Sequence, residues 1–430
     1  MLLNVVLSII VFLIAAVCVT VVLRMLGVTG FSLKKTHVLL EKTPSLSGEP
    51  FTVAMGWKTV AWGAGTLLAL YGVSIVYCAI DGGGVSLEAL YNAWSHADAI
   101  HYRSLAELGY HGYIEDGQHL FLVFFPLYPW LVRLLNLLLS DYSLSGHLLS
   151  ALSYMGGCVV LARLVTEEFG WRTGRMSLLL FSAYPYAFFF AGVYTESLFF
   201  LLSVTTFYFI RRHRYFWAGV FGALAALTRM QGIFLLLVGF AEYAAADQPF
   251  KRLKARDWKS LWQDVEEKLA PLVLMLAGTC VYLVLTDQVE GDSLRFLFYQ
   301  REHWFQHSVP LPVCLSTIWR GLTESGNTEL IWTIWFPELA VFFLCLFGLL
   351  YAGRRLPVTW VVYFLICLVL NYSLSWPLSC GRYIACAFPL PVAMAVMSRR
   401  HPFAGQLLGH IFALLQGAFL IFYLSAGAMF

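Results

Sequence analysis

The chain contains 430 residues, of which 60% are hydrophobic and 12% are charged, and its formal net charge at pH 7 is +3. A soluble domain is about 45–50% apolar and about 25% charged, so this composition excludes a soluble globular protein and predicts an integral membrane protein. The small net charge gives no indication of a nucleic-acid partner.

Apolar runs long enough to cross about 30 Å of hydrocarbon recur along the chain. The first, residues 2–26, lacks a basic leading segment and a small-residue cleavage site, so we expect a retained span rather than a signal peptide. Four more long runs cover residues 60–80, 145–165, 329–351 and 404–426, and three shorter ones cover residues 270–286, 357–373 and 383–398.

The apolar pattern between residues 176 and 243 is interrupted by Pro185, Glu196, a basic cluster at 211–214 and Arg229. These interruptions predict four short or broken spans, which usually line a polar cavity. No internal repeat or separate soluble domain is visible. The predicted fold is therefore one all-α polytopic membrane domain over residues 1–430, with about twelve transmembrane helices.

The distribution of Lys and Arg predicts the orientation of these spans. With the N-terminus outside, the cytoplasmic segments hold about 21 of the 28 basic residues. One such segment, residues 244–269, contains an amphipathic stretch from Lys251 to Lys268, where we expect an interfacial helix; a calmodulin-type target helix is the alternative. Other basic residues assigned to this side are Lys34, Lys35, Lys42, Lys58, Arg163, Arg172, Arg175, Arg354, Arg355, Arg399 and Arg400.

Two long segments on the non-cytoplasmic side, residues 81–143 and 287–327, are rich in aromatic and polar residues. Segments of this length are usually functional or disordered, and their aromatic content argues against disorder. We therefore expect both to be external loops that carry interfacial helices, and residues 81–143 to form the catalytic loop.

Asp98 is the first candidate for chemistry. On a continuous helix, Trp94, Asp98 and His101 would fall on one stripe, together with Tyr102. A carboxylate between aromatic rings can act as a general base on a sugar or alcohol hydroxyl. The alternative is a solvated aspartate that caps a short interfacial helix.

Glu196 and Arg229 lie between strongly apolar runs. A charge at membrane depth is costly and usually faces a polar cavity or a partner, so the two could bind a ligand or form an internal salt bridge with each other. Arg229 could hold a phosphate through two N–H groups. Arg382 begins a predicted span on the external side, where it could bind an anionic ligand or reach outer headgroups.

Gln300 and Trp304 form a pair typical of a carbohydrate site, although packing of their loop against the membrane face explains them equally well. Cys314 and Cys380 lie in predicted external loops and either pair or stay free, and no C-x-x-C pair indicates a zinc or redox site. Phosphate-binding glycine loops, zinc-hydrolase motifs and serine-nucleophile motifs are missing, so no cofactor and no obligatory metal is expected.

Six short motifs occur in order over roughly residues 60–400, nearly the whole chain. They are W-x-x-x-D-A-x-H-Y (Trp94, Asp98, Ala99, His101, Tyr102) with Gly109-Tyr110, F-F-P-L-Y-P (Phe124 to Pro129), Y-x-E-S-L-F (Tyr194, Glu196 to Phe199), T-R-x-Q-G (Thr228 to Gly232), Q-x-x-x-W (Gln300, Trp304) and R-Y-x-x-x-x-F-P-L (Arg382 to Leu390). Together they resemble the PIG-V, or GPI mannosyltransferase II, family of polyprenyl-phosphate-dependent mannosyltransferases in the GT-C class. Relatives commonly carry Arg-Trp before the aspartate; here His96-Ala97 stands there, so that arginine's contact is lost or passes to His96.

The resemblance implies a GT-C-like fold and transfer of a mannosyl residue, with inversion, from a dolichol- or undecaprenyl-type polyprenyl phosphate to a hydroxyl of a glycolipid or glycan. It implies Asp98 as the base and, for donor or acceptor binding, His96, His101, Tyr102, Tyr110, Glu196, Arg229, Gln300, Trp304 and Arg382. A transporter or flippase of lipid-linked sugars is the alternative, and a scaffold without activity is a third interpretation. Short loops and the lack of a visible retrieval signal favour a bacterial plasma membrane over the endoplasmic reticulum.

Overall fold

The computed structural model describes residues 2–28, 48–82, 84–353 and 355–427. The assignments made for Lys34, Lys35, Lys42 and Arg354 therefore lie outside the described residues. Within these ranges the chain contains no β-strand, only the isolated bridges Glu115–Gln118 and Ser308–Leu374. The prediction of an all-α protein is confirmed.

Seven helices of the described ranges are long and apolar enough to cross a membrane. They are Leu7–Gly27 within α1 (Leu2–Val28), α3 (Val53–Ile80), α7 (Tyr142–Phe169), Met230–Asp247, Trp258–Glu290, Thr328–Ala352 and α23 (Pro402–Leu424). Shorter apolar helices are α6 (Leu127–Leu139), α10 (Tyr215–Thr228) and α20 (Val358–Asn371). The protein is a multi-pass membrane protein, while the number of about twelve spans stays a prediction.

The interrupted region folds into short helices, as its pattern predicted. They are α8 (Trp171–Ser182), the 3-10 turn η2 (Ala187–Ala191), α9 (Glu196–Arg211), α10, the 3-10 turn η3 (Met230–Phe234) and α11 (Leu235–Asp247). The breaks follow from local chemistry: Pro185 has no N–H to continue a helix, and Arg229 is extended (φ −154°, ψ 147°). Glu196 and Arg229 both stand at helix ends, where their side chains can meet.

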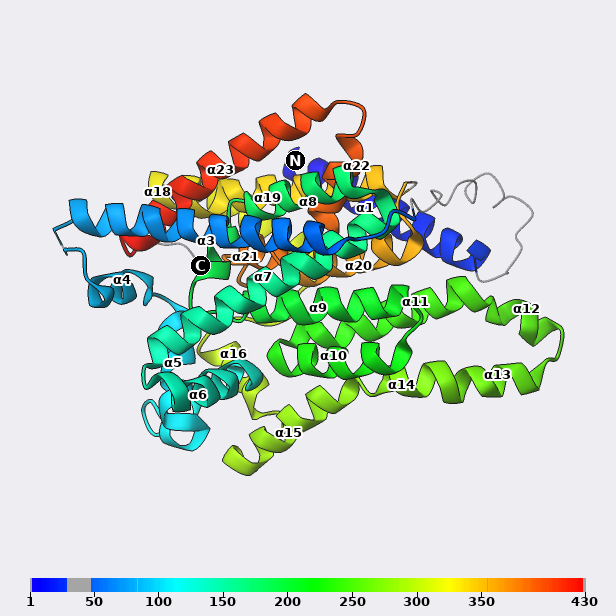
Figure 1. Cartoon of the computed structure of the whole chain (residues 1–430), viewed down its shortest axis with the longest axis horizontal. Coiled ribbons are helices and arrows are strands. Elements are labelled where there is room, and N and C mark those ends of the chain that lie inside the picture. The colour runs from blue at the N-terminus through cyan, green and yellow to red at the C-terminus, as the bar shows by residue number, and fades with distance from the viewer. Residues whose placement is uncertain (1, 29–47, 83, 354, 428–430) are drawn as a thin grey trace.

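Segments predicted to lie on opposite sides of the membrane are found at the two ends of the molecule (Figure 1). At one end lie α4 (Leu87–Trp94), α5 (Asp98–Gly112) and α6, with η1 (Leu120–Val123) between α5 and α6 in the chain. The hairpin of α12 (Pro249–Lys254) and α13 (Trp258–Asp264) lies at the other. This separation fits the predicted orientation, which assigns residues 81–143 and 244–269 to opposite sides of the membrane.

The stretch from Lys251 to Lys268 is not one continuous helix. It turns at Arg256, which has a positive φ of 56°. The Asp257 carboxylate accepts the Ser260 N–H and begins a new helix there. That helix continues through the π-turn η4 (Val265–Leu269), α14 (Ala270–Val273) and α15 (Leu276–Glu290). The second half of the predicted interfacial helix is therefore the start of a span.

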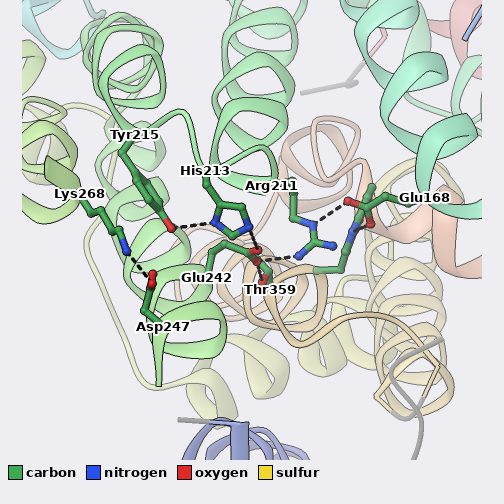
Figure 2. Close-up of polar contacts among 9 residues, drawn as sticks. Glu168, Arg211, His213, Tyr215, Glu242, Asp247, Lys268 and Thr359 are labelled. Atoms are coloured by element: carbon green, nitrogen blue, oxygen red, sulfur yellow. Dashed lines mark hydrogen bonds and ion pairs between the residues drawn. The ribbon is translucent and has the colours of Figure 1, made fainter. Parts of the chain in front are cut away.

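A buried ionic cluster ties four helices together (Figure 2). Arg211 Nε donates to Glu168 Oε1 and its Nη1 donates to Glu242 Oε2, each at 2.7 Å. Trp360 Nε1 donates to the other oxygen of Glu168 at 2.8 Å, and the Thr359 hydroxyl donates to Glu242. Charges buried with their hydrogen bonds made hold the downstream end of α9 against α7, α11 and the upstream end of α20.

The rest of the described chain completes the bundle. It comprises α16 (Arg295–Glu302), α17 (Leu311–Glu324), α18 (Thr328–Leu330), the π-turn η5 (Ile331–Trp335), α19 (Phe336–Ala352), α21 (Cys380–Ile384) and α22 (Pro389–Met397). The run predicted as one span over residues 383–398 is split between α21 and α22, and Pro389, which has no N–H to continue a helix from α21, begins α22.

Candidate active site

Four charged side chains from distant parts of the chain meet in one place. Asp98 is the first residue of α5, and Glu196 is the first residue of α9. Arg229 occupies the break after α10, and Arg382 lies in the five-residue helix α21. Because each residue sits at a helix end or in a very short helix, its side chain can project along the helix axis into the space between helices.

Arg382 links the two carboxylates. Its Nη1 donates to Asp98 Oδ2 at 2.7 Å and its Nε donates to Glu196 Oε1 at 2.6 Å. Arg229 Nη1 lies 3.0 Å from the same oxygen of Glu196. The Arg382 and Glu196 side chains are 3% and 0% exposed, whereas that of Asp98 is 29% exposed. Two positive and two negative groups balance, and Asp98 is the member most open to a substrate.

Arg229 is paired with Glu196 and also lines a pocket. Its Nη1 lies 3.0 Å from Glu196 Oε1. The guanidinium lies 4.8 Å from the ring centroid of Tyr383. It lines a pocket together with Phe199, Gln231, Tyr363, Asn371 and Tyr383, and the Asn371 side-chain oxygen is buried without a partner. The pocket thus offers a cationic donor and a neutral acceptor inside largely apolar walls.

The turn before Asp98 corrects the predicted helical stripe. α4 ends at Trp94 and α5 begins at Asp98, with Ala97 between them at φ 47° and ψ −130°. Since the turn carbonyls lack helical partners, tyrosines from elsewhere bind them: Tyr194 OH donates to His96 O at 2.8 Å and Tyr423 OH donates to Trp94 O at 3.0 Å. Strained backbone persists where surrounding contacts enforce it, and here they hold Asp98 at the N-terminus of α5.

His96 and Tyr102 flank the ionic cluster. The His96 ring packs edge-on against Tyr423 with centroids 5.5 Å apart, and its buried Nε2 has no hydrogen-bond partner. Burial lowers the pKa of His96, so the neutral ring is favoured. The Tyr102 hydroxyl lies 3.4 Å from Thr195 Oγ1, next to Glu196 in sequence.

An aromatic group joins the two external segments beside the cluster. His101 stacks on Phe121 with centroids 4.6 Å apart, and its Nδ1 lies 3.0 Å from Tyr113 OH. Trp304 packs edge-on against Phe121, at 6.2 Å between centroids. The structure therefore brings His101 and Trp304, predicted separately, around one ring.

Two predicted residues make contacts away from the cluster. Tyr110 OH donates to the carbonyl of Phe124 at 2.6 Å, so it holds the F-F-P-L-Y-P segment. Gln300 Nε2 donates to Gln306 Oε1 at 2.7 Å within its own segment. Their roles in substrate binding stay predictions.

The sequence interpretation missed residues whose importance is tertiary. Tyr423 lies in the apolar α23 and is 1% exposed, and nothing in its neighbourhood distinguishes it. Glu338 could have been noticed, because it interrupts an apolar run as Glu196 does. Cys314 and Cys380 are both free thiols in the structure, which agrees with one of the two alternatives.

Comparisons with known proteins bear on this arrangement. The family model described as dolichyl-phosphate-mannose-protein mannosyltransferase matches residues 125–263. The chain is 28% identical over 275 residues to GPI alpha-1,6-mannosyltransferase 2 of Cricetulus griseus, covering 60% of this chain and 50% of that protein. It is 29% identical over 273 residues to the protein of that name from Rattus norvegicus, covering 59% and 50%.

A solved structure shares the fold. ArnT from Cupriavidus metallidurans bound to undecaprenyl phosphate matches with a TM-score of 0.51 and 17% identity, over 83% of this chain and 63% of that one. The chain spans about half the length of the curated relatives it matches. The chain is thus similar in sequence to these mannosyltransferases over part of its length, and it shares the fold of ArnT over most of its residues.

Proposed function

We propose that the protein is an inverting glycosyltransferase that moves a mannosyl residue from a polyprenyl phosphate, of dolichol or undecaprenyl type, to a hydroxyl of a glycolipid or glycan on the non-cytoplasmic face. The observation that carries the proposal is the partly exposed Asp98 carboxylate, held by the buried Arg382 beside a second guanidinium. Support comes from the curated relatives, which are named as mannosyltransferases. No observation favours the transporter alternative.

Asp98 acts in the proposal as the general base. Its Oδ2 accepts a hydrogen bond from Arg382, and none of the hydrogen bonds within the described ranges uses Oδ1. The acceptor hydroxyl gives its proton to Asp98 while its oxygen bonds to the anomeric carbon. The bond from that carbon to the phosphate oxygen breaks, and polyprenyl phosphate leaves as an anion. A single displacement inverts the anomeric centre and needs one carboxylate as base.

The cations complement the leaving group. Arg229 is placed to donate to a phosphate oxygen because its guanidinium, which is 12% exposed, lines the neighbouring pocket. Such a donor stabilises negative charge as it develops on the phosphate. Phe199, Tyr363 and Leu370 in the wall of the neighbouring pocket offer apolar contacts of the kind that an isoprenoid chain makes. A donor that is both anionic and apolar matches both features.

The aromatic group of His101, Phe121 and Trp304 is proposed to face the sugar or the acceptor. Aromatic rings at such a site give apolar contact to the faces of sugar rings. We propose no obligatory metal and no cofactor. We propose a bacterial plasma membrane as the site of action, with the endoplasmic reticulum membrane as the alternative.

The proposal is tested by transfer of radiolabelled mannose from polyprenyl-phosphate-mannose in membranes that contain the wild-type chain or Asp98→Asn, with EDTA present. The variant keeps the shape of the side chain and removes the base, so we expect transfer to fall by about 10²–10⁴-fold. Asp116→Asn is the matched control, because Asp116 is an exposed aspartate of the same external segment at a positive φ that Asn accepts.

Equal transfer by wild type and Asp98→Asn would remove Asp98 as the base. Failure of the wild type to transfer from this donor, with a detectable glycolipid pool present, would contradict the donor assignment. Loss of wild-type transfer in EDTA would contradict the expectation of a metal-independent reaction.

A further inference from the structure

A second buried acidic residue lies near the ionic cluster but outside it. Glu338 belongs to α19 and is 0% exposed. No ion pair involves Glu338 within the described ranges, in contrast to Glu196. A carboxyl group enclosed without a cation is costly, so its hydrogen bonds indicate why it is there.

Glu338 binds the backbone of the residue that precedes Arg382. Its Oε2 accepts the N–H of Gly381 at 2.8 Å. The carbonyl of the same Gly381 accepts the hydroxyl of Tyr184 at 2.9 Å. The peptide groups on both sides of Gly381 are thus held by side chains from α19 and from the segment between α8 and η2.

The close approach of Tyr186 adds a steric restraint. A Cβ at Gly381 would lie 2.6 Å from the Tyr186 ring, so this backbone passes directly against the ring. The hydrogen bond to Glu338 and the contact with the Tyr186 ring together limit the movement of α21. Tyr372 OH in turn donates to the carbonyl of Glu338 at 2.8 Å, which fixes α19 relative to the end of α20.

α21 needs such restraints because it has only five residues. A single helical turn is not stable by itself, and its first N–H groups have no partner inside the helix. Glu338 supplies the acceptor from a neighbouring helix. The direction of the Arg382 side chain follows from the position of this turn, and Arg382 must reach Asp98 and Glu196 together.

We infer that Glu338 is a positioning residue: by binding the Gly381 N–H it fixes α21 and directs Arg382 at Asp98 and Glu196. The inference rests on the proposed function for its consequence in catalysis. Glu338 touches the backbone rather than any reacting atom, so the requirement is for an acceptor oxygen at this position. A side chain that keeps that oxygen will therefore serve, and an apolar side chain of similar size will not.

The test compares Glu338→Gln with Glu338→Leu in the full chain, assayed for mannosyl transfer at equal membrane expression. We expect Glu338→Leu to lower kcat by about 100-fold with little change in KM, because small displacements of catalytic groups act on the transition state. Glu338→Gln is expected to stay within about threefold of the wild type, since its amide oxygen accepts the same N–H. Glu329→Leu is the control, because Glu329 lies exposed in the same helical run.

A double-mutant cycle decides the inference even if the donor assignment fails. Thermal unfolding is measured for Glu338→Leu, Arg382→Gln and the double variant in detergent. We expect the losses in Tm to be less than additive, because both changes disrupt the same arrangement. Additive losses, or equal damage by Glu338→Gln and Glu338→Leu, would overturn the positioning role. A wild type that transfers nothing while the cycle shows coupling would leave the positioning intact and reject the proposed donor.

Discussion

The position of Arg382 changes how the charged residues around it are interpreted. The sequence left Glu196 and Arg229 open as a ligand site or as a salt bridge. The structure shows the ion pair, and it also shows Arg382 continuing from Glu196 to Asp98. Because a buried charge must be compensated, the chain of alternating charges both neutralises Glu196 and holds the more exposed Asp98 in place.

His101 gives a prediction for stability against pH. Burial lowers the pKa of His101 below its ordinary value of 6.5, and the charge of Asp98 partly opposes this. The unfolded chain therefore binds a proton more readily than the folded protein does. The stability contributed by neutral His101 is present above about pH 6.5 and is lost as the pH falls towards the lower pKa of the folded state.

We expect the Tm of the wild type to fall more steeply between pH 8 and pH 5.5 than that of His101→Gln. Detergent-purified protein and thermal unfolding provide the measurement. His401→Gln, at an exposed histidine, serves as the control and should keep the wild-type slope. An identical slope for wild type and His101→Gln would show that His101 does not titrate differently in the two states.

Small residues set the spacing between α10 and the helices α14 and α15. A Cβ at Gly278 would lie 1.9 Å from the carbonyl oxygen of Ala223, and one at Gly219 would lie 2.1 Å from the carbonyl oxygen of Pro271. Backbones this close are typical of membrane helix interfaces built on small residues. The break at Arg229 directly follows α10, so this packing also bears on the cluster.

Gly278→Ala is therefore expected to destabilise the protein by about 1–3 kcal/mol, because the added methyl group forces the two helices apart. Gly417→Ala in α23 is the matched control, since no atom lies within 4 Å of the added Cβ. Thermal unfolding of the two variants in the same detergent gives the comparison. Equal Tm values for both would mean that α10 and α15 have room to adjust.

At the scale of the whole molecule, the external segments and the hairpin of α12 and α13 lie at opposite ends (Figure 1). We expect a cysteine at Glu107, in α5, to react with a membrane-impermeant maleimide from the outside. A cysteine at Lys259, in α13, should react only after the membrane is opened. Both side chains are exposed in the fold, so the side of the membrane on which each residue lies determines whether it is labelled.

Unmodified protein is the background control, because the chain contains nine cysteines of its own. Labelling of both positions from the same side would contradict the orientation derived from the basic residues. It would also contradict a reaction on the non-cytoplasmic face, since Asp98 lies in the same helix as Glu107.

The sequence by itself determined the class of fold and most helix positions, and it singled out the charged residues that meet in the structure. Lipid offers the backbone no hydrogen bonds, so a segment that crosses it must be helical and apolar. An apolar run such as 145–165 can therefore be recognised without knowledge of the helices that pack against it. The interruptions at Glu196 and Arg229 also predicted the short helices correctly, because the cost of burying a charge is a local property.

Only the tertiary structure decided how those groups act together. Asp98, Glu196 and Arg382 are far apart in the chain, and pairing between them depends on where helices cross, which no local pattern records. The break between Trp94 and Asp98 was missed because tyrosines from α23 and from the segment before α9 enforce it. The hydrophobicity of a residue and the cost of burying its charge are properties of that residue alone. The distances between side chains depend on how the helices pack.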